Sequence, residues 1–163
     1  MHSRIIQISK EPINEDDYFS EDQYYDNFCG EIADYVDGDT DRDDDIEWFI
    51  GCLGDSISYN KDEQSFTIID KEKYFDKAFD QFQELLEKLS DTTLEVFSGI
   101  GKKDELYQFT ADMYSLKSAY DDKFSFYIDD NGEYFGMSTI DNFMRNVENN
   151  TKFYIGTTID YHF

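Results

Sequence analysis

The chain has 163 residues, of which 38 are acidic and 14 basic, and its formal net charge is −24. Aromatic residues make up 18% of it, which argues against a disordered acidic chain, because such chains are poor in large apolar side chains. The shortage of bases argues against nucleic acid as a direct ligand, since no basic stripe is present to neutralise phosphates. The length fits one domain with its own core.

The first predicted element is a strand over residues 4–9, which are largely β-branched. A helix is predicted over residues 20–36, because Ser20 begins a capping pattern and apolar residues then recur every three to four positions. A second helix is predicted over residues 43–53, and Gly54 is suited to end it.

The second half of the chain alternates hairpins with helices. Alternating aromatics around Asn131 and Gly132 predict a tight β-hairpin turn, because both residues accept positive φ angles. The other predicted elements are strands at 56–60 and 65–70, helices at 70–90 and 103–120 around a helical turn at 92–101, a helix at 139–148 and a strand at 152–163.

Two hairpins without regular strand–helix alternation predict an α+β fold. We expect one domain over residues 1–163, with helices packed on a mostly antiparallel sheet of about five to six strands. An acidic helical subdomain over residues 11–55 is an alternative division of the chain.

The negative charge is concentrated in the N-terminal third. Residues 11–55 contain seventeen acids and one base, Arg42, which is a net charge of −16, whereas the other 118 residues carry only −8. A charge that serves solubility would be spread evenly. Adaptation to high salt is an alternative, although eleven lysines and a high Phe and Ile content fit it poorly.

Calcium is one possible reason for the aspartates in residues 37–49. Asp37, Asp39 and Asp41 match positions 1, 3 and 5 of an EF-hand loop. The sixth position, which needs glycine, holds Arg42, and the twelfth, which needs glutamate, holds Trp48. We therefore expect no metal site of this kind and no cofactor, with an irregular cation site as a weaker alternative.

A helix N-terminus is a second reason. Acids in the first turn of the predicted helix at 43–53 interact favourably with its free N–H groups, by roughly 0.3–1 kcal/mol each. This effect is limited to the first turn, so it leaves most of the charge in residues 11–55 unexplained.

A basic protein partner is the third reason and the one that we favour. Alternate carboxylates on an extended chain lie about 6.5–7 Å apart, and carboxylates at i, i+4 on a helix about 5–6 Å apart, which is of the order of phosphate spacing in DNA. Tyrosine can stack on the arginine that a carboxylate pairs with. The candidate partner-binding residues are Glu15, Asp16, Asp17, Tyr18, Glu21, Asp22, Asp26, Asp34, Asp37, Asp39, Asp41, Asp43, Asp44 and Asp45.

No catalytic pattern emerges. The stretch SGIGKKDE lacks both the first glycine and the Ser or Thr of a phosphate-binding loop. A site built from His2 and His162 would require the two ends of the chain to meet, which we do not expect. Cys29 and Cys52 lie in apolar patterns and are expected to be buried, reduced thiols.

In size and charge the chain resembles the small acidic DNA-mimicking inhibitors of phages and mobile elements, such as antirestriction and anti-CRISPR proteins. No motif carries this resemblance, so no residue role follows from it. It favours a non-enzymatic inhibitor that blocks the nucleic-acid groove of a basic bacterial immune effector. The alternatives are an immunity or antitoxin-type protein that neutralises a basic toxin such as a nuclease, and, more weakly, a calcium-binding protein. Without an apolar signal segment or membrane span, we expect a cytoplasmic location.

Because exposed like charges repel one another in the folded state, we expect moderate salt to raise the melting temperature. The measurement is a thermal melt followed by circular dichroism at increasing NaCl concentration. A flat or falling response would mean that the acids are paired within the fold.

Overall fold

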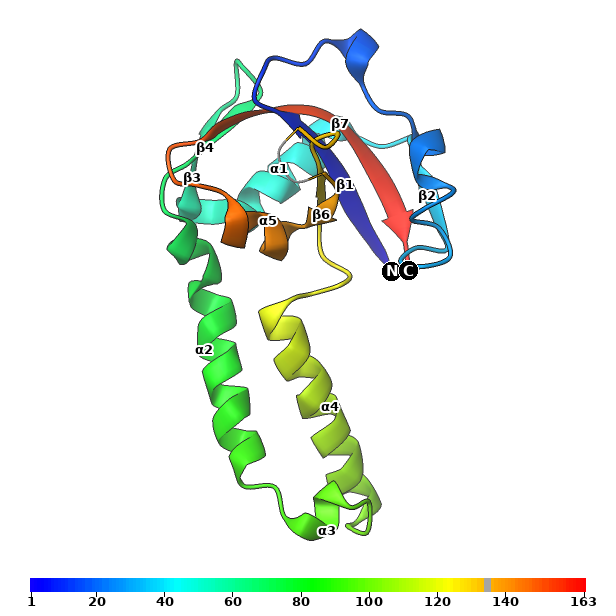
Figure 1. Cartoon of the computed structure of the whole chain (residues 1–163), viewed down its shortest axis with the longest axis vertical. Helices are drawn as coiled ribbons and strands as arrows, with labels where there is room; N and C mark the ends of the chain where they lie inside the picture. Colours follow the sequence, from blue (N-terminus) through cyan, green and yellow to red (C-terminus); the bar gives the residue numbers. More distant parts are fainter. Residues whose placement is uncertain (134–135) are drawn as a thin grey trace. The chain divides into compact units, whose positions relative to one another are not determined.

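The computed structural model describes residues 1–133 and 136–163 (Figure 1). The chain divides into two compact units. The first unit combines Met1–Tyr74 with Lys123–Phe163, and the second is Phe75–Asp122. All of residues 11–55 lie in the first unit. The division into one domain with an acidic helical subdomain stays a prediction.

A sheet of seven strands is the framework of the first unit. The strands are β1 (His2–Ser9), β2 (Tyr35–Asp37), β3 (Ile57–Asn60), β4 (Ser65–Ile68), β5 (Tyr127–Asp129), β6 (Ser138–Thr139) and β7 (Lys152–His162). Their order is β3-β4-β7-β1-β5-β6, and β2 also pairs with β7. Among the described strands, β1 and β5 are the one parallel pair. The predicted α+β fold with a mostly antiparallel sheet is therefore confirmed.

The helices α1 (Arg42–Leu53) and α5 (Ile140–Asn146) pack on one face of this sheet (Figure 1). The centre of this core is aromatic. Phe49 of α1 packs edge-on against Phe66 of β4 at 5.7 Å between ring centroids, and Phe143 of α5 packs against Phe153 of β7 at 5.3 Å. All four rings are fully buried, so the helices are fixed on the sheet by apolar burial.

The other face of the sheet is covered by residues 19–36. Tyr24, Phe28 and Val36 pack there in one cluster with strand residues such as Ile159. The hydroxyl of Tyr24 donates to the Asp129 carboxylate over 3.0 Å. Burial and this carboxylate raise the pKa of Tyr24, so the phenol stays protonated and keeps the hydrogen bond.

The helix predicted over residues 20–36 is wrong. A 3-10 turn, η1 (Glu15–Asp17), precedes the segment. The segment itself forms a second 3-10 turn, η2 (Glu21–Tyr24), then turns and β2. Ser20 still caps, because its hydroxyl accepts from Asp22 N. Gly30, at φ +90°, breaks any helix. Like charges at Asp22 and Asp26 also disfavour one.

A β-bulge interrupts β7 where it pairs with β1, between Ile6 and Ile8. The buried side chain of Gln7 fills the bulge and accepts from Thr157 N over 3.1 Å. Gly156 is required here, because an added Cβ would lie 2.4 Å from the Gln7 oxygen.

Strands β5 and β6 pair on either side of Asn131, but in the register of Ile128 with Ser138, which is not that of the predicted tight hairpin. Asn131 and Gly132 both have positive φ, and Glu133 N donates to Asp130 O over 3.0 Å, which closes the expected turn. The aromatic pair at positions 134 and 135, which the hairpin prediction includes, lies outside the described residues. The loop between the paired strands is longer than a two-residue turn.

The second unit is a helical hairpin. Helix α2 (Lys71–Ser90), whose first turn belongs to the first unit, is followed by α3 (Leu94–Phe97) and α4 (Lys103–Tyr120) (Figure 1). Lys88 pairs with Asp112 over 2.8 Å across α2 and α4. None of the apolar side chains described in this unit is buried. No helix among the described residues combines the length and apolarity needed to cross a membrane.

Phe49→Ala is expected to lower the free energy of unfolding of the first unit by about 3–5 kcal/mol, because it leaves a cavity between α1 and the sheet. The measurement is urea unfolding followed by circular dichroism. Ile69→Ala is the control, since Ile69 is half exposed, and it should cost less than about 1 kcal/mol. Equal losses would contradict this assignment of the core.

Candidate functional site

The acids of residues 11–55 point almost entirely to solvent. Asp45 is buried and Glu21 is half-buried, and the other acids of this segment are exposed. In the described part of the chain, ten of the candidate carboxylates have no Lys, Arg or His nitrogen within 4.0 Å. They are Glu15, Asp16, Asp17, Glu21, Asp22, Asp26, Asp37, Asp39, Asp41 and Asp44. The charge of these ten carboxylates is therefore not neutralised by a neighbouring base among the described residues.

Two separate loops of the segment come together through Glu21. Its carboxylate accepts a short hydrogen bond from Gly38 N, and a Cβ on Gly38 would collide with it. Asp37, at the end of β2, accepts from Asp39 N over 2.9 Å. These bonds hold the 3-10 turn η2 beside the loop that follows β2.

Tyr25 lies exposed among these carboxylates. The pKa of its phenol is raised, first by partial removal from water and then by the charges of Glu21, Asp22 and Asp37. In the helix predicted over residues 20–36, Tyr25 falls on the apolar side, so it is not among the candidate partner-binding residues. An exposed ring surrounded by carboxylates is suited to a guanidinium, which can stack and pair at once.

The start of α1 carries a second group of acids. Asp41 is the N-cap and accepts from Asp44 N over 3.3 Å. Asp43 is exposed, and its one described cationic neighbour is Arg42 at 3.9 Å. The acids of this turn therefore interact with the N-terminus of α1, as the sequence predicts, and Asp41, Asp43 and Asp44 also point to solvent.

Asp45 departs from the expectation of an outward-facing candidate. It is buried, accepts from Arg4 Nε over 2.6 Å and from the Thr158 hydroxyl over 3.0 Å. Arg4 also donates a short hydrogen bond to Asp160. Asp45 faces the sheet because it lies four and eight residues before Phe49 and Leu53, on the buried side of α1. It therefore serves the fold and is not available to a partner.

Arg42, the one base of the segment, is directed inward. Its Nε donates to Gly156 O over 2.6 Å, and its terminal nitrogens donate to Ile155 O and the Gln64 side chain, both over 3.0 Å. The guanidinium carbon lies 5.3 Å from the centre of the Tyr18 ring. Tyr18, a candidate contact, is therefore already stacked on an internal arginine.

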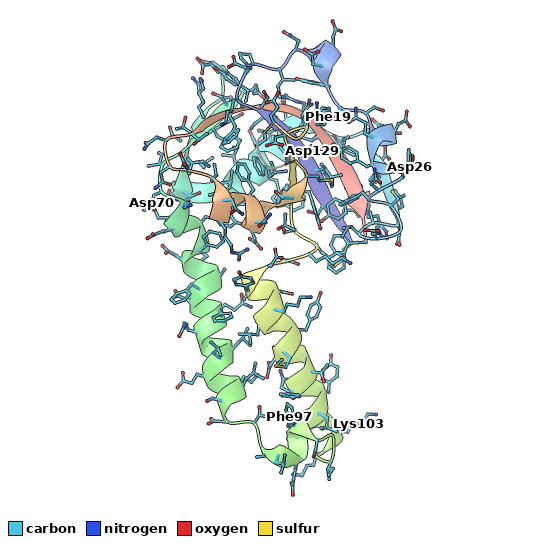
Figure 2. All side chains as sticks on the ribbon, in the orientation of Figure 1. Phe19, Asp26, Asp70, Phe97, Lys103 and Asp129 are labelled. Atoms are coloured by element: carbon cyan, nitrogen blue, oxygen red, sulfur yellow. The ribbon has the colours of Figure 1, made fainter. Side chains whose placement is uncertain are left out.

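The acidic loop around η1 is tied to the bulge by Gln7. The Gln7 amide donates to Asp17 O over 2.9 Å and its oxygen accepts from Phe19 N over 3.2 Å. Figure 2 shows Phe19 over the sheet and Asp26 at the outer edge of the first unit. Gln7 thus holds the backbone inward, while Glu15, Asp16 and Asp17 remain exposed.

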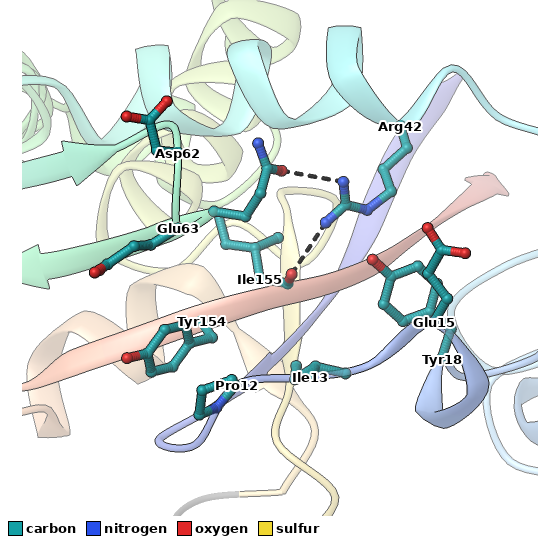
Figure 3. Close-up of a pocket in the computed structure, with 10 residues that line it drawn as sticks. Pro12, Ile13, Glu15, Tyr18, Arg42, Asp62, Glu63, Tyr154 and Ile155 are labelled. Carbon is teal, nitrogen blue, oxygen red and sulfur yellow. Dashed lines mark hydrogen bonds between the residues drawn. The ribbon is translucent and has the colours of Figure 1, made fainter.

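A depression of about 510 Å³ opens beside this loop (Figure 3). Arg42 forms one wall, and the carboxylates of Glu15 and Asp62 approach from the loop and from the β3–β4 turn. Glu63 also lines it, with its pKa held below the usual value by Lys152. Asp62 and Glu63 fall outside the predicted set, because their strand turn is distant in sequence. The walls of the depression therefore combine aromatic and acidic groups with the Arg42 guanidinium.

The two ends of the chain meet, contrary to the expectation for the histidines. His2 and His162 are paired across β1 and β7, with ring centroids 5.0 Å apart. Each ring has its own carboxylate: His2 lies 2.7 Å from Asp160, and His162 lies 3.2 Å from Asp34, the remaining candidate acid.

The described residues contain no group of three side chains that could hold a metal ion. Cys29 and Cys52 are free thiols. Cys29 is half-buried, whereas Cys52 is exposed, so the burial predicted for Cys52 is wrong.

Gln7→Ala is expected to lower the free energy of unfolding by about 1–3 kcal/mol, because it leaves Phe19 N and Thr157 N without their acceptor. Hydrogen exchange of residues 13–20 should accelerate in the variant. Gln23→Ala removes an exposed glutamine and should change neither quantity measurably. Unchanged exchange in Gln7→Ala would show that the loop is held by other contacts.

We find no match for this chain among models of protein families, curated proteins or solved structures.

Proposed function

We propose that the protein is a non-enzymatic inhibitor, located in the cytoplasm, that occupies the nucleic-acid groove of a basic bacterial immune effector. Its acidic surface would take the place of the phosphate backbone. The outward orientation of the carboxylates in residues 11–55, with Arg42 turned inward, is the observation that carries this proposal. A groove built to bind phosphates presents arginine and lysine, for which such a surface is complementary.

The charge is presented by a firm backbone, which favours mimicry over a flexible acidic tail. Asp41 is fixed as a helix cap, Asp37 by a local turn and Glu21 by Gly38 N. Fixed carboxylates lose little conformational entropy on binding, which improves affinity for a groove of matching shape. Long-range attraction between opposite charges would speed the encounter.

One place on this surface offers more than charge. Tyr25, with Glu21, Asp22 and Asp37 around it, provides a ring and carboxylates for one arginine. Such a point would fix how the inhibitor is aligned in the groove, which uniform charge alone does not.

The first test is competition. The protein is added to restriction endonucleases and to guide-loaded CRISPR nucleases, and DNA binding is followed by mobility shift. We expect loss of DNA binding at an equimolar ratio for at least one effector, weakening as salt rises. In parallel, the protein is co-expressed with nuclease toxins. Rescue from a toxin with no effect on the effectors would identify an immunity protein and overturn the proposed target.

The second test removes charge without changing shape. Asp16, Asp26, Asp39 and Asp44 are changed together to Asn; their side chains are exposed and none is an acceptor in the described hydrogen bonds. We expect the association rate with the effector to fall at least about 10-fold at low salt, with little change in dissociation.

The matched control removes four charges from the second unit, by amide replacement of Asp76, Glu84, Asp91 and Asp104, all of which are exposed. Its association rate should change less than about 3-fold. Equal effects of the two sets would show that net charge, and not the surface of residues 11–55, governs recognition.

A further inference from the structure

The helical hairpin of the second unit carries a continuous heptad pattern on both helices. In α2 the apolar residues are Phe75, Phe79, Phe82, Leu86 and Leu89, and in α4 they are Leu106, Phe109, Met113, Leu116 and Tyr120. The spacing alternates between three and four throughout, which is the repeat of a coiled coil or helical bundle. In coiled coils and bundles, the apolar residues of such a repeat are buried along the whole length of the helix.

The hairpin buries only one of the two rows of this repeat in part. Phe82, Leu89, Phe109 and Leu116 are half-buried. The other row consists of Phe79, Leu86, Leu106, Met113 and Tyr120. Leu106 is half-buried, whereas Phe79, Leu86, Met113 and Tyr120 remain 59, 42, 47 and 60% exposed. We call these four residues the open row. Two helices alone do not cover both rows, whereas four helices around a common core do.

The open row lies on one side of the hairpin. The ion pair of Lys88 with Asp112 shows which residues of α2 and α4 lie at the same height along the helix axes. With equal rise per residue, Leu86 then lies level with about residue 114, next to Met113. Because α2 and α4 run antiparallel and are rotated alike about their own axes, their open positions turn to the same side. The result is one apolar face.

The open row exposes on the order of 400 Å² of side-chain surface, taking roughly 200 Å² for a full side chain. A stable interface uses about 800 Å² per partner, so the polar side chains that flank the row on both helices have to supply the rest of the contact. Isolated surface residues need no explanation, but a heptad row of this area does.

The charges beside the open row suit a second copy of the same chain. On α2 the flanking residues Asp80 and Glu87 are acidic, and on α4 the flanking Lys117 is basic. By the level that Lys88 sets, Lys117 lies opposite about residue 83, between those acids. A two-fold axis parallel to the helices places α4 of one copy against α2 of the other, so Lys117 falls between the partner copy's acids. The face is self-complementary.

We propose that the second unit is a dimerisation module: the open rows of two copies pack together and the two hairpins form a four-helix bundle. The bundle buries Phe79, Leu86, Met113 and Tyr120 in its core. The proposal is independent of the proposed function, because it uses no residue of the acidic surface. The two also respond to salt in opposite directions. Each copy carries −24, so salt should strengthen dimerisation by screening repulsion, whereas it should weaken binding to a basic partner.

The test is sedimentation equilibrium of the full chain at 0.05 and 0.5 M NaCl, with far-UV circular dichroism as a check on folding. We expect a monomer–dimer equilibrium whose dissociation constant falls at the higher salt. Leu86→Glu with Met113→Glu should raise that constant at least about 100-fold, because buried core positions dominate interface energies. Lys77→Gln with Gln81→Glu adds the same charge on the far side of α2 and should raise it less than about 5-fold.

A charge exchange tests the two-fold arrangement without touching the apolar face. Lys117→Glu should weaken the dimer several-fold more than Lys77→Glu, which changes the charge equally. Adding Asp80→Lys to Lys117→Glu should restore the dimer. A wild-type chain that is monomeric at both salt concentrations up to about 100 μM would overturn the proposal. The open row would then be a binding site for a different protein.

Discussion

The bulge in β7 is the feature on which the acidic surface depends. A bulge leaves backbone groups of one strand without partners in the ladder. In this fold two side chains take the place of those missing partners. Gln7 of the neighbouring strand accepts from Thr157 N, and Arg42 at the start of α1 donates to Gly156 O and Ile155 O. The same two side chains also fix the two ends of the acidic segment, since Gln7 holds residues 17–19 and Arg42 begins α1. A local irregularity of the sheet thus anchors a surface that is long in sequence.

The outward direction of the charge follows from how the segment wraps the sheet. Residues 19–36 insert Tyr24 and Phe28 into one face, and α1 inserts Ile46 and Phe49 into the other. With apolar groups facing both cores, the acids between them are left on the solvent side. The exception, Asp45, is compensated by Arg4. Within residues 1–55, Arg4 and Arg42 are half-buried and bonded to groups of the fold, whereas every acid except Asp45 and Glu21 is exposed.

Most of the fold was readable from local patterns. The bounds of α4 match the predicted 103–120, and α1, α2 and β7 lie within two residues of expectation. The failure at residues 20–36 has a physical cause: apolar spacing reports which side chains are buried but not how the backbone carries them there. The positive φ of Gly30 and the pairing of β2 with the distant strand β7 make this segment non-helical.

The site was predictable in its charge and not in its geometry. Sequence identified the exposed acids, because charge this dense cannot be buried. It could not show that Asp45 turns inward. Asp43, Asp44 and Asp45 are chemically identical neighbours, and only the packing of α1 on the sheet determines which of them faces the core. Nor could it show that Tyr25 is exposed, or that Asp62 and Glu15 line the same depression, because both depend on contacts distant in sequence.

The position of β7 in the sheet has a consequence for how the protein is made. This strand lies between β4 and β1 and also carries β2, yet it follows every other strand in the sequence. During synthesis, β1 therefore waits without its antiparallel neighbour until residues 152–162 have emerged, and such non-local closure is slow. Until then the strand edges of the chain are exposed and can associate with those of other nascent chains. Mutual repulsion among the carboxylates opposes that association.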